Sequence, residues 1–422
     1  MPFVFYDLET TGLDRRYDQI VGFAAIRTDE DLNEIDRFVC DCRLMPHVVA
    51  SPGALERNGL TLEELTGGHR PTHFEAMRSV FRKLEDWGGA LYVGYNSIIF
   101  DEEFLRQAFF MTLHPPYLTS MPGNGRADAL ALARTVALLR PGALIIGAHD
   151  GRKSFRLEDM CVVNGVDHLN AHTALGDVLA TAELCRRARD ADEEAWTKFL
   201  RNSTKAAVAE VVDVEPAFLH VRFKGNEIIC EVLVSLATDD QNGNARLCLP
   251  ITFDAEAFKS ATDEVATAMI LGPGGLRLLK LNKSPIVCSL DEAPEGAGVE
   301  FEAPALETGS GWRGDDALRR RLCDVVRTSR PERVAPTELE DMLYLDLPDP
   351  RDRGLLKNFH DADWEDRPAV IASFHDPRHR SIGRRLLYLE RPDLLEARTL
   401  ARLQAAVADR VRTRSAIVQG MI

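Results

Sequence analysis

The sequence predicts an α/β domain, followed by a small β domain and a helical C-terminal domain. Three observations lead to this prediction. Strand-like and helix-like patterns alternate over residues 1–200, and strand-like runs dominate residues 201–292. Residues 293–422 begin with a segment rich in Gly, Ala, Glu and Pro and continue as arginine-rich helical patterns. A chain of 422 residues is long enough for three domains with these boundaries.

The first domain contains both periodicities. Short apolar runs bounded by turn residues are typical of strands, and they lie at residues 2–8, 20–28, 35–42 and 90–96. Apolar residues three or four positions apart are typical of helices, and they cover residues 73–88, 101–110, 128–139, 156–165 and 172–188. Alternation of the two element types predicts an α/β fold.

The remaining chain is predicted in less detail. Strands are expected at residues 218–225, 228–236 and 276–290, with a polar turn at residues 238–245. Residues 291–311 have weak periodicity, which predicts a linker or loose loop. Helices are expected at residues 317–330, 379–390 and 397–414.

Composition narrows the class of protein only partly. A net charge of −15 is not typical of a nucleic-acid binder, although a local groove can be positive on an acidic protein. No apolar run approaches the roughly 18 residues that span a bilayer, and we expect no signal peptide, no membrane contact and a cytoplasmic location. The eight cysteines contain no Cys-x-x-Cys pair, so we expect reduced core residues instead of a zinc site.

Two carboxylates end the first apolar run, in the stretch "FVFYDLETTG". Asp7 and Glu9 are two residues apart, so on a strand they point to the same face. Two like charges are costly to bury unless a cation compensates them, and ligands that are all oxygen suit Mg²⁺ or Mn²⁺. We therefore expect a metal site. A solvated strand end or a helix cap are the alternatives.

Two later stretches extend this pattern. In "YNSIIFDEEF", Asp101 follows a strand and opens a helix, a position where an Asp is most often only a cap. In "NAHTALGD", His172 and Asp177 are five residues apart, which is about 140° around an ideal helix. The two side chains can converge only if His172 precedes the helix that carries Asp177, with Asn170 as the natural cap.

This ordered series of acids and a histidine resembles the motifs of the DEDDh family of 3′→5′ exonucleases. The segments "FAAIRTD", "SFRLEDM", "LNKSPIV" and "LEDMLYLDLPDPRDRGLLKNFHDADW" resemble, in the same order, those of the bacterial exonuclease I group within that family. The likeness covers nearly the whole chain. Exonuclease I typically has aromatic residues where this chain has Leu8 and Thr11.

The resemblance implies a ribonuclease H-like fold with a mixed central sheet, a small β-barrel-like second domain, and three domains that close around a single strand. It implies that Asp7, Glu9, Asp101 and Asp177 bind two Mg²⁺ ions per site, with Mn²⁺ as the alternative, and that His172 is the general base. The implied activity is processive hydrolysis of single-stranded DNA to nucleoside monophosphates in DNA repair and recombination. The implied partner is single-stranded DNA-binding protein, and we expect a monomer.

Substrate contacts are expected from Glu9, Thr10 and Thr11, which follow one another at the end of the first strand. The two threonines can bond the terminal nucleotide through hydroxyl or backbone, or they can form a plain turn. Arg156 in "SFRLEDM" offers forked donors to phosphate, and the alternative is a salt bridge to Glu158 or Asp159. Residues further along the chain are also candidates for contacts with the DNA strand, and the alternative is that they are ordinary solvent-exposed residues. These candidates are His220, Arg222, Phe223, Lys224, Arg319–Arg321, Arg384 and Arg385.

Two other functions remain open. A related 3′→5′ exoribonuclease would have the same carboxylates, because these do not recognise the sugar, whereas contacts to the 2′-hydroxyl would. A binding module with a degenerate site predicts a missing ligand or base, and all five residues are present.

Overall fold

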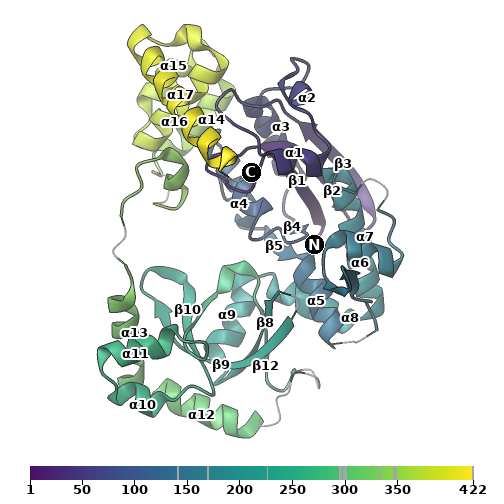
Figure 1. Cartoon of the computed structure of the whole chain (residues 1–422), viewed down its shortest axis with the longest axis vertical. Coiled ribbons are helices and arrows are strands. Elements are labelled where there is room, and N and C mark those ends of the chain that lie inside the picture. The colour runs from purple at the N-terminus through teal and green to yellow at the C-terminus, as the bar shows by residue number, and fades with distance from the viewer. Residues whose placement is uncertain are drawn as a thin grey trace. The chain divides into compact units, whose positions relative to one another are not determined.

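The computed structural model describes residues 1–139, 142–168, 171–225, 227–293, 297, 302–331, 334–345 and 349–420. These residues form two compact units (Figure 1). The first comprises Met1–Asn124, His168–Leu179 and Val334–Ile422, and the second comprises Gly125–Asp167 and Ala180–Arg333.

A mixed β-sheet is the centre of the first unit. Within this unit its strands have the order β3-β2-β1-β4, and they are β1 (Phe3–Thr10), β2 (Ile20–Thr28), β3 (Glu34–Asp41) and β4 (Leu91–Gly94). Strand β1 is antiparallel to β2 and parallel to β4, which confirms the predicted mixed sheet. The pairing of β1 with β2 shifts between Glu9 and Thr10, a bulge of the kind that redirects side chains near functional sites.

Helices cover this sheet with the periodicity that the sequence predicts. Helix α3 (His73–Trp87) begins with a capping box formed by Thr72 and Glu75. It buries Phe74, Met77, Phe81 and Leu84. The last three pack with β1 side chains and with α4 in one apolar core. The other helices of this part are α1 (Pro52–Asn58), α2 (Leu62–Thr66), α4 (Asp101–Met111) and the start of α7 (Ala174–Ala191).

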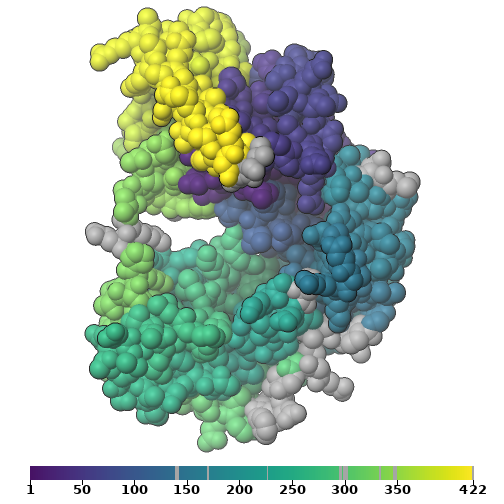
Figure 2. Space-filling view, in the orientation of Figure 1, coloured from purple at the N-terminus to yellow at the C-terminus, as the bar shows by residue number. Residues whose placement is uncertain are grey.

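The C-terminal helices belong to the same unit as the sheet. They are η4 (Leu339–Tyr344), α14 (Asp352–Asp361), α15 (Arg367–Ser373), α16 (Pro377–Glu390), η5 (Pro392–Leu394) and α17 (Ala397–Gln419). Phe359, Phe374 and Ile382 share an apolar core with Phe74 of α3 and Phe110 of α4. In the space-filling view, the yellow α17 lies directly against the purple N-terminal residues (Figure 2).

The second unit contains an open antiparallel sheet. Its strands are β8 (Phe218–Lys224), β9 (Glu227–Asp239), β10 (Asn242–Pro250), β11 (Arg277–Lys280) and β12 (Ile286–Ser289). The order β11-β10-β9-β8-β12 leaves β11 and β12 as edges, and no pairing between described residues joins them. The barrel-like closure is therefore not confirmed. The predicted turn at residues 238–245 was too long, because β9 and β10 continue through most of it.

Helices and short strands complete the second unit. The helices are α5 (Ala129–Leu139), α6 (Leu157–Asn164), α8 (Glu193–Asn202), α9 (Lys205–Val214), α10 (Ala255–Ser260), α11 (Asp263–Leu271), α12 (Glu302–Gly314) and α13 (Asp316–Ser329). The short elements are β5 (Gly125–Asp128), β6 (Gly147–His149), β7 (Arg152–Ser154) and η2 (Leu281–Lys283).

The prediction of a loose linker over residues 291–311 was wrong where helix α12 begins. Ala305 of this helix is buried in the core of the second unit. Gly309 lies so close to Pro216 that a Cβ would be 2.3 Å from the Pro216 carbonyl oxygen. The small residues that suggested a linker therefore permit close packing. Residues 294–296 and 298–301 of the predicted linker lie outside the described residues.

Two predictions from composition can be compared with the structure. All eight cysteines are free, as expected for reduced core residues. In the described part of the chain, no helix has the length and apolar character needed to cross a membrane.

Candidate active site

Asp7 and Glu9 lie on one face of β1, close to its C-terminal end. They pair across the sheet with Ala24 and Gly22 of β2. The small residue at position 22 gives Glu9 its room, because a Cβ there would be only 3.1 Å from the Glu9 Cβ. The strand periodicity therefore positions both carboxylates as predicted from the sequence.

The fold adds two more carboxylates to this pair. Burial raises the pKa of Asp7 well above its ordinary value, and nearby Asp101, Asp177 and Glu9 raise it further. Burial and the Asp177 charge raise the pKa of Glu9 to about 8. The four predicted acidic positions are thus close enough to repel one another when ionised.

Asp101 is the first residue of α4 and is almost completely buried. The helix cap is Phe100, so Asp101 does not occupy the capping position that was the alternative. A tight loop leads to it from β4. A Cβ on Gly94 would lie 2.5 Å from the Ser97 Cβ, and Asn96 has a left-handed φ of 62°. These turns return the chain towards β1 before α4 begins.

His172 lies two residues before the start of helix α7, and Asp177 lies in the first turn of that helix. His172 has a φ of 63°, and its backbone N–H donates to Asp177 Oδ1 at 3.3 Å. The Thr173 hydroxyl accepts from the Gly176 N–H at 3.1 Å, which is the bond of a helix cap. His172 thus precedes the helix that carries Asp177, as convergence requires, and convergence of the two side chains stays a prediction, while Asn170 lies outside the described residues.

Four residues that lie near these carboxylates, either in space or in the sequence, were missed by the sequence analysis. His168 Nε2 donates to Asp177 Oδ1 at 2.6 Å. The positive charge of Arg57, on α1, lowers the pKa of Asp7 and of Glu9, against the larger effects that raise them. Leu13 is 85% exposed just after the turn that follows β1, and Ile99 is 68% exposed two residues before Asp101. Leu13 and Ile99 could have been found in the sequence, because each is an apolar residue within or directly after a motif that carries a predicted acid.

The two threonine hydroxyls are engaged within the protein. Thr10 Oγ1 donates to the Gly12 carbonyl oxygen at 2.8 Å. Thr11 Oγ1 donates to Asp18 Oδ1 at 3.2 Å and accepts from the Gln19 N–H at 3.0 Å. Both threonines are buried. Their side chains therefore shape the turn after β1, and a contact with the terminal nucleotide through their backbone stays a prediction.

Arg156 belongs to the second unit, at the cap position of α6. Its guanidinium Nη1 donates to His149 Nε2 at 2.8 Å and lies 3.9 Å from Glu158 Oε1. The side chain is mostly exposed and lines an open pocket of the second unit with His149, Arg152 and Lys153. Several cations therefore gather around Arg156, which is compatible with phosphate binding as well as with the weak ion pair.

Most of the remote candidates for holding a strand make internal contacts. Phe223 packs against the Arg134 guanidinium, whose carbon lies 4.4 Å from the ring centroid. His220 is half-buried. The arginines among these candidates form the ion pairs Arg222–Glu231, Arg319–Asp316, Arg321–Asp263 and Arg385–Glu340. These four arginines stabilise the fold, and none of them is placed by the structure as a dedicated nucleic-acid contact.

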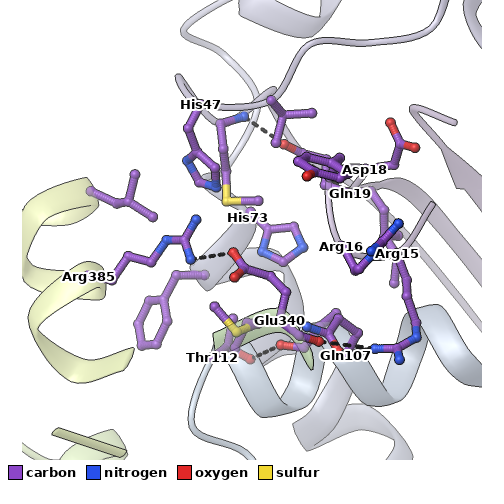
Figure 3. A pocket seen from close by; sticks show the side chains of 18 of the residues that line it. Arg15, Arg16, Asp18, Gln19, His47, His73, Gln107, Thr112, Glu340 and Arg385 are labelled. Carbon is purple, nitrogen blue, oxygen red and sulfur yellow. Dashed lines mark hydrogen bonds and ion pairs between the residues drawn. The ribbon is translucent and has the colours of Figure 1, made fainter. Parts of the chain in front are cut away.

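A separate pocket lies inside the first unit, between the start of β2, α3, α4 and the C-terminal helices (Figure 3). Its described lining includes none of the five predicted catalytic residues. His47 and His73 are buried there, and Arg385 donates to Glu340 across the pocket at 2.6 Å. Burial, Arg385 and Arg410 hold the pKa of His47 well below its ordinary value.

The donor chemistry at β1 fits a hard divalent cation. In the part of the chain that the structure describes, no three His, Cys, Asp or Glu side chains are arranged to hold a metal ion as they stand. The four carboxylates nevertheless offer only oxygen ligands, and burial together with the neighbouring carboxylates raises the pKa of Asp7 and of Glu9. A bound cation would reverse this repulsion by stabilising the ionised forms.

Known proteins provide an independent comparison. The profile of the Exonuclease family matches residues 4–185, which include all five predicted catalytic residues. Exodeoxyribonuclease I of Escherichia coli K12 is 26% identical over 402 residues, which cover 89% of this chain and 82% of that protein. Exodeoxyribonuclease I of Haemophilus influenzae is 28% identical over 355 residues, which cover 78% of this chain and 73% of that protein.

The solved structures agree in fold. The crystal structure of E. coli exonuclease I in complex with a dA16 oligonucleotide matches with a TM-score of 0.86 at 22% identity, covering 100% of this chain and 94% of that one. The exonuclease domain at residues 4–185 thus has the ribonuclease H-like fold with a mixed sheet. In its sequence and its fold together, the chain is similar to the exodeoxyribonuclease I proteins of bacteria, and residues 4–185 match the Exonuclease family.

Proposed function

We propose that the protein removes nucleotides from the 3′ end of single-stranded DNA, releasing nucleoside monophosphates, in DNA repair and recombination. The observation that carries this proposal is the cluster of four carboxylates around β1, with His172 two residues before the helix of Asp177. The similarity to proteins named exodeoxyribonuclease I supports DNA as the substrate. The E. coli enzyme has been solved with dA16 and dT13 oligonucleotides.

The carboxylates Asp7, Glu9, Asp101 and Asp177 would hold two divalent ions, Mg²⁺ or Mn²⁺. When bound, such ions lower the pKa of the attacking water and stabilise the leaving oxygen of the phosphodiester. The E. coli complex with single-stranded DNA has been solved in a zinc-bound form and in a metal-free form. The carboxylates themselves offset the charge of the ions.

His172 would accept the proton of the attacking water. An imidazole titrates near neutral pH, so it can accept a proton and release it again within one turnover. Its place before α7 is set by the left-handed backbone at His172 and by the bond from its N–H to Asp177. This geometry keeps the base adjacent to a metal ligand while leaving its ring outside the helix.

The terminal nucleotide would be held by groups around the carboxylates. Leu13 and Ile99 present exposed apolar side chains against which a base can pack, a contact that needs no sequence readout. Arg57 carries a positive charge towards Asp7 and Glu9 and would attract a phosphate. The backbone of Glu9, Thr10 and Thr11 and the Arg156 guanidinium are further proposed contacts.

We extend the proposal to partner and organisation. A complex described as SSB/exonuclease I with an inhibitor matches this chain with a TM-score of 0.81 at 22% identity. We therefore propose single-stranded DNA-binding protein as the partner of a monomer that acts in the cytoplasm. We also propose three domains: an exonuclease domain at residues 1–200, a small β domain at residues 201–292, and a linker with a helical domain at residues 293–422.

The substrate class is tested with three 5′-labelled substrates and Mg²⁺. These are single-stranded DNA, blunt duplex DNA and single-stranded RNA of the same sequence. The proposal predicts fastest shortening of the single-stranded DNA. Faster degradation of RNA would favour the exoribonuclease instead. Binding of single-stranded DNA without cleavage of any substrate would favour the inactive binding module.

A further inference from the structure

We propose that His168 is a positioning residue, which orients the Asp177 carboxylate for binding of the divalent ion. This inference rests on the proposed function, because it assigns a role to a residue behind one of the proposed metal ligands. It adds a second histidine to the site, distinct from the proposed general base.

The carboxylate of Asp177 receives two hydrogen bonds at one oxygen. His168 Nε2 donates to Oδ1 at 2.6 Å, and the His172 backbone N–H donates to the same oxygen at 3.3 Å. Neither bond involves Oδ2. Two donors on one oxygen restrict rotation of the carboxylate about its Cβ–Cγ bond, and thereby fix the direction in which the other oxygen points.

Burial makes the contact with His168 strong. The His168 side chain is only 8% exposed, and the Asp177 side chain is 21% exposed. A short hydrogen bond to a carboxylate with little access to water is a charge-assisted bond, which is stronger than a neutral one. The bond joins a residue before the His172 turn to the first turn of α7, so it holds the ligand before any ion arrives.

The same contact separates the roles of the two histidines. A carboxylate oxygen can only accept, so His168 Nε2 carries a proton and donates it to Asp177. That nitrogen is therefore not available to accept a proton from water. His172 contributes its backbone N–H to Asp177, so the two histidines contact this carboxylate through different groups. Partners behind metal ligands commonly change metal affinity by about 10–100-fold when they are removed.

The test measures Mn²⁺ binding to the full-length, metal-stripped protein from the spectrum of free Mn²⁺ in electron paramagnetic resonance. The variants are His168→Ala and His168→Gln, whose amide N–H₂ can reach the position of Nε2. His73→Ala is the matched control, since His73 is a buried histidine of the same unit that lines the separate pocket. Asp177→Asn reports on the proposed metal centre itself.

We expect H168A to weaken Mn²⁺ binding about 10–100-fold and H168Q to recover most of that loss. H73A should lower the melting temperature while leaving Mn²⁺ affinity unchanged. If His168 has only a structural role, H168A should lower the melting temperature and leave Mn²⁺ affinity unchanged, as expected for H73A. That result would overturn the inference. If H168A does not fold, wild-type affinity in His168→Asn, which shortens the donor, would overturn it equally.

Failure of the inference and failure of the proposed function give different results. If D177N loses Mn²⁺ while H168A and H168Q both bind as wild type, the metal centre stands and the positioning role is wrong. If D177N itself binds Mn²⁺ as wild type, the proposed metal centre is wrong.

Discussion

Arg414 donates through Nη2 to both carboxylate oxygens of Asp18, at 2.7 and 3.0 Å, although the two residues are 396 positions apart. Both side chains are buried. Asp18 also accepts from the Thr11 hydroxyl and from the Asp14 N–H. The last helix of the chain therefore stabilises the turn that follows the strand of Asp7 and Glu9.

Removal of this buried ion pair should affect stability and substrate binding together. Arg414→Ala leaves the Asp18 charge buried without its partner, which typically costs about 3–5 kcal/mol of the free energy of unfolding. The turn that carries Leu13 should also loosen, raising KM for single-stranded DNA. The measurements are urea unfolding and steady-state hydrolysis. Arg412→Ala is the control, because Arg412 is exposed on the same helix and should have little effect. Equal effects of the two variants would contradict this account.

Stability should fall in acid because of buried histidines. Burial lowers the pKa of His73 to about 4, and the pKa of His360 also to about 4, from the ordinary 6.5 (Figure 3 shows His73). Between pH 6.5 and 4 the unfolded chain therefore binds more protons than the folded one. The stability that these neutral rings contribute is present above pH 6.5 and is lost as the pH falls towards 4.

His73→Gln isolates this effect from other titrating groups. Each histidine contributes at most about 1.4 kcal/mol per pH unit to the slope of the free energy of unfolding. The slope between pH 6.5 and 5 should be shallower in H73Q than in the wild type by up to that amount. Urea unfolding at several pH values measures it. Identical slopes would mean that folding does not lower the pKa of His73.

Metal affinity should rise with pH. Burial raises the pKa of Glu9 to about 8, so this group holds a proton at neutral pH in the metal-free protein, and burial also raises the pKa of Asp7 well above its ordinary value. Metal binding must displace the protons that these groups hold, so the affinity should strengthen up to about tenfold per pH unit for each proton released, until the pH reaches the pKa of Glu9. Calorimetry in buffers of different ionisation enthalpy counts the protons. An affinity that is constant between pH 6.5 and 8 would argue against the protonated cluster, and Glu9→Gln should release one proton fewer.

Arg57 should hold substrate phosphate beside the carboxylates. Arg57→Ala is expected to raise KM for single-stranded DNA several-fold and to reduce the slope of log affinity against log salt by about 0.7. It should also raise the pKa of Glu9 further, because the positive charge that lowers it is lost. Arg398→Ala removes an exposed arginine of α17 and serves as the control. The same salt slope in R57A and R398A would remove Arg57 from the substrate site.

The sequence predicted those parts of the site that local patterns specify. Strand periodicity placed Asp7 and Glu9 on one face, and the motif order identified Asp101, His172 and Asp177. Periodicity also predicted the mixed sheet's strands and the arginine-rich helices at the C-terminal end. These features depend on residues within one element, so spacing alone reveals them.

The rest depends on contacts between distant segments. No motif connects Arg414 to Asp18. The hydrogen bond between His168 and Asp177 forms only when the chain between them folds, so spacing does not predict it. Arg57 lies on a short helix with no buried residues, so periodicity gave no signal for it. Gly309 was read as part of a linker, because its close approach to Pro216 is a tertiary contact that the sequence does not reveal. A substrate contact was considered for the hydroxyl of Thr11. Its partner, Asp18, lies seven residues further along the chain, and no local pattern reveals this hydrogen bond.

The most direct test of the central claim is the product ladder from 5′-labelled single-stranded DNA with Mg²⁺, run for the wild type, Asp7→Asn and Asp86→Asn. Both substitutions remove one negative charge, but Asp86 is exposed on α3. The account predicts that the wild type and D86N shorten the DNA progressively from its 3′ end. It predicts that the rate of D7N is lower by at least about a thousandfold, because this substitution removes a proposed ligand of the metal centre. Equal ladders for D7N and D86N, or loss of the 5′ label as the first product, would contradict the claim that the carboxylates around β1 hydrolyse DNA from its 3′ end.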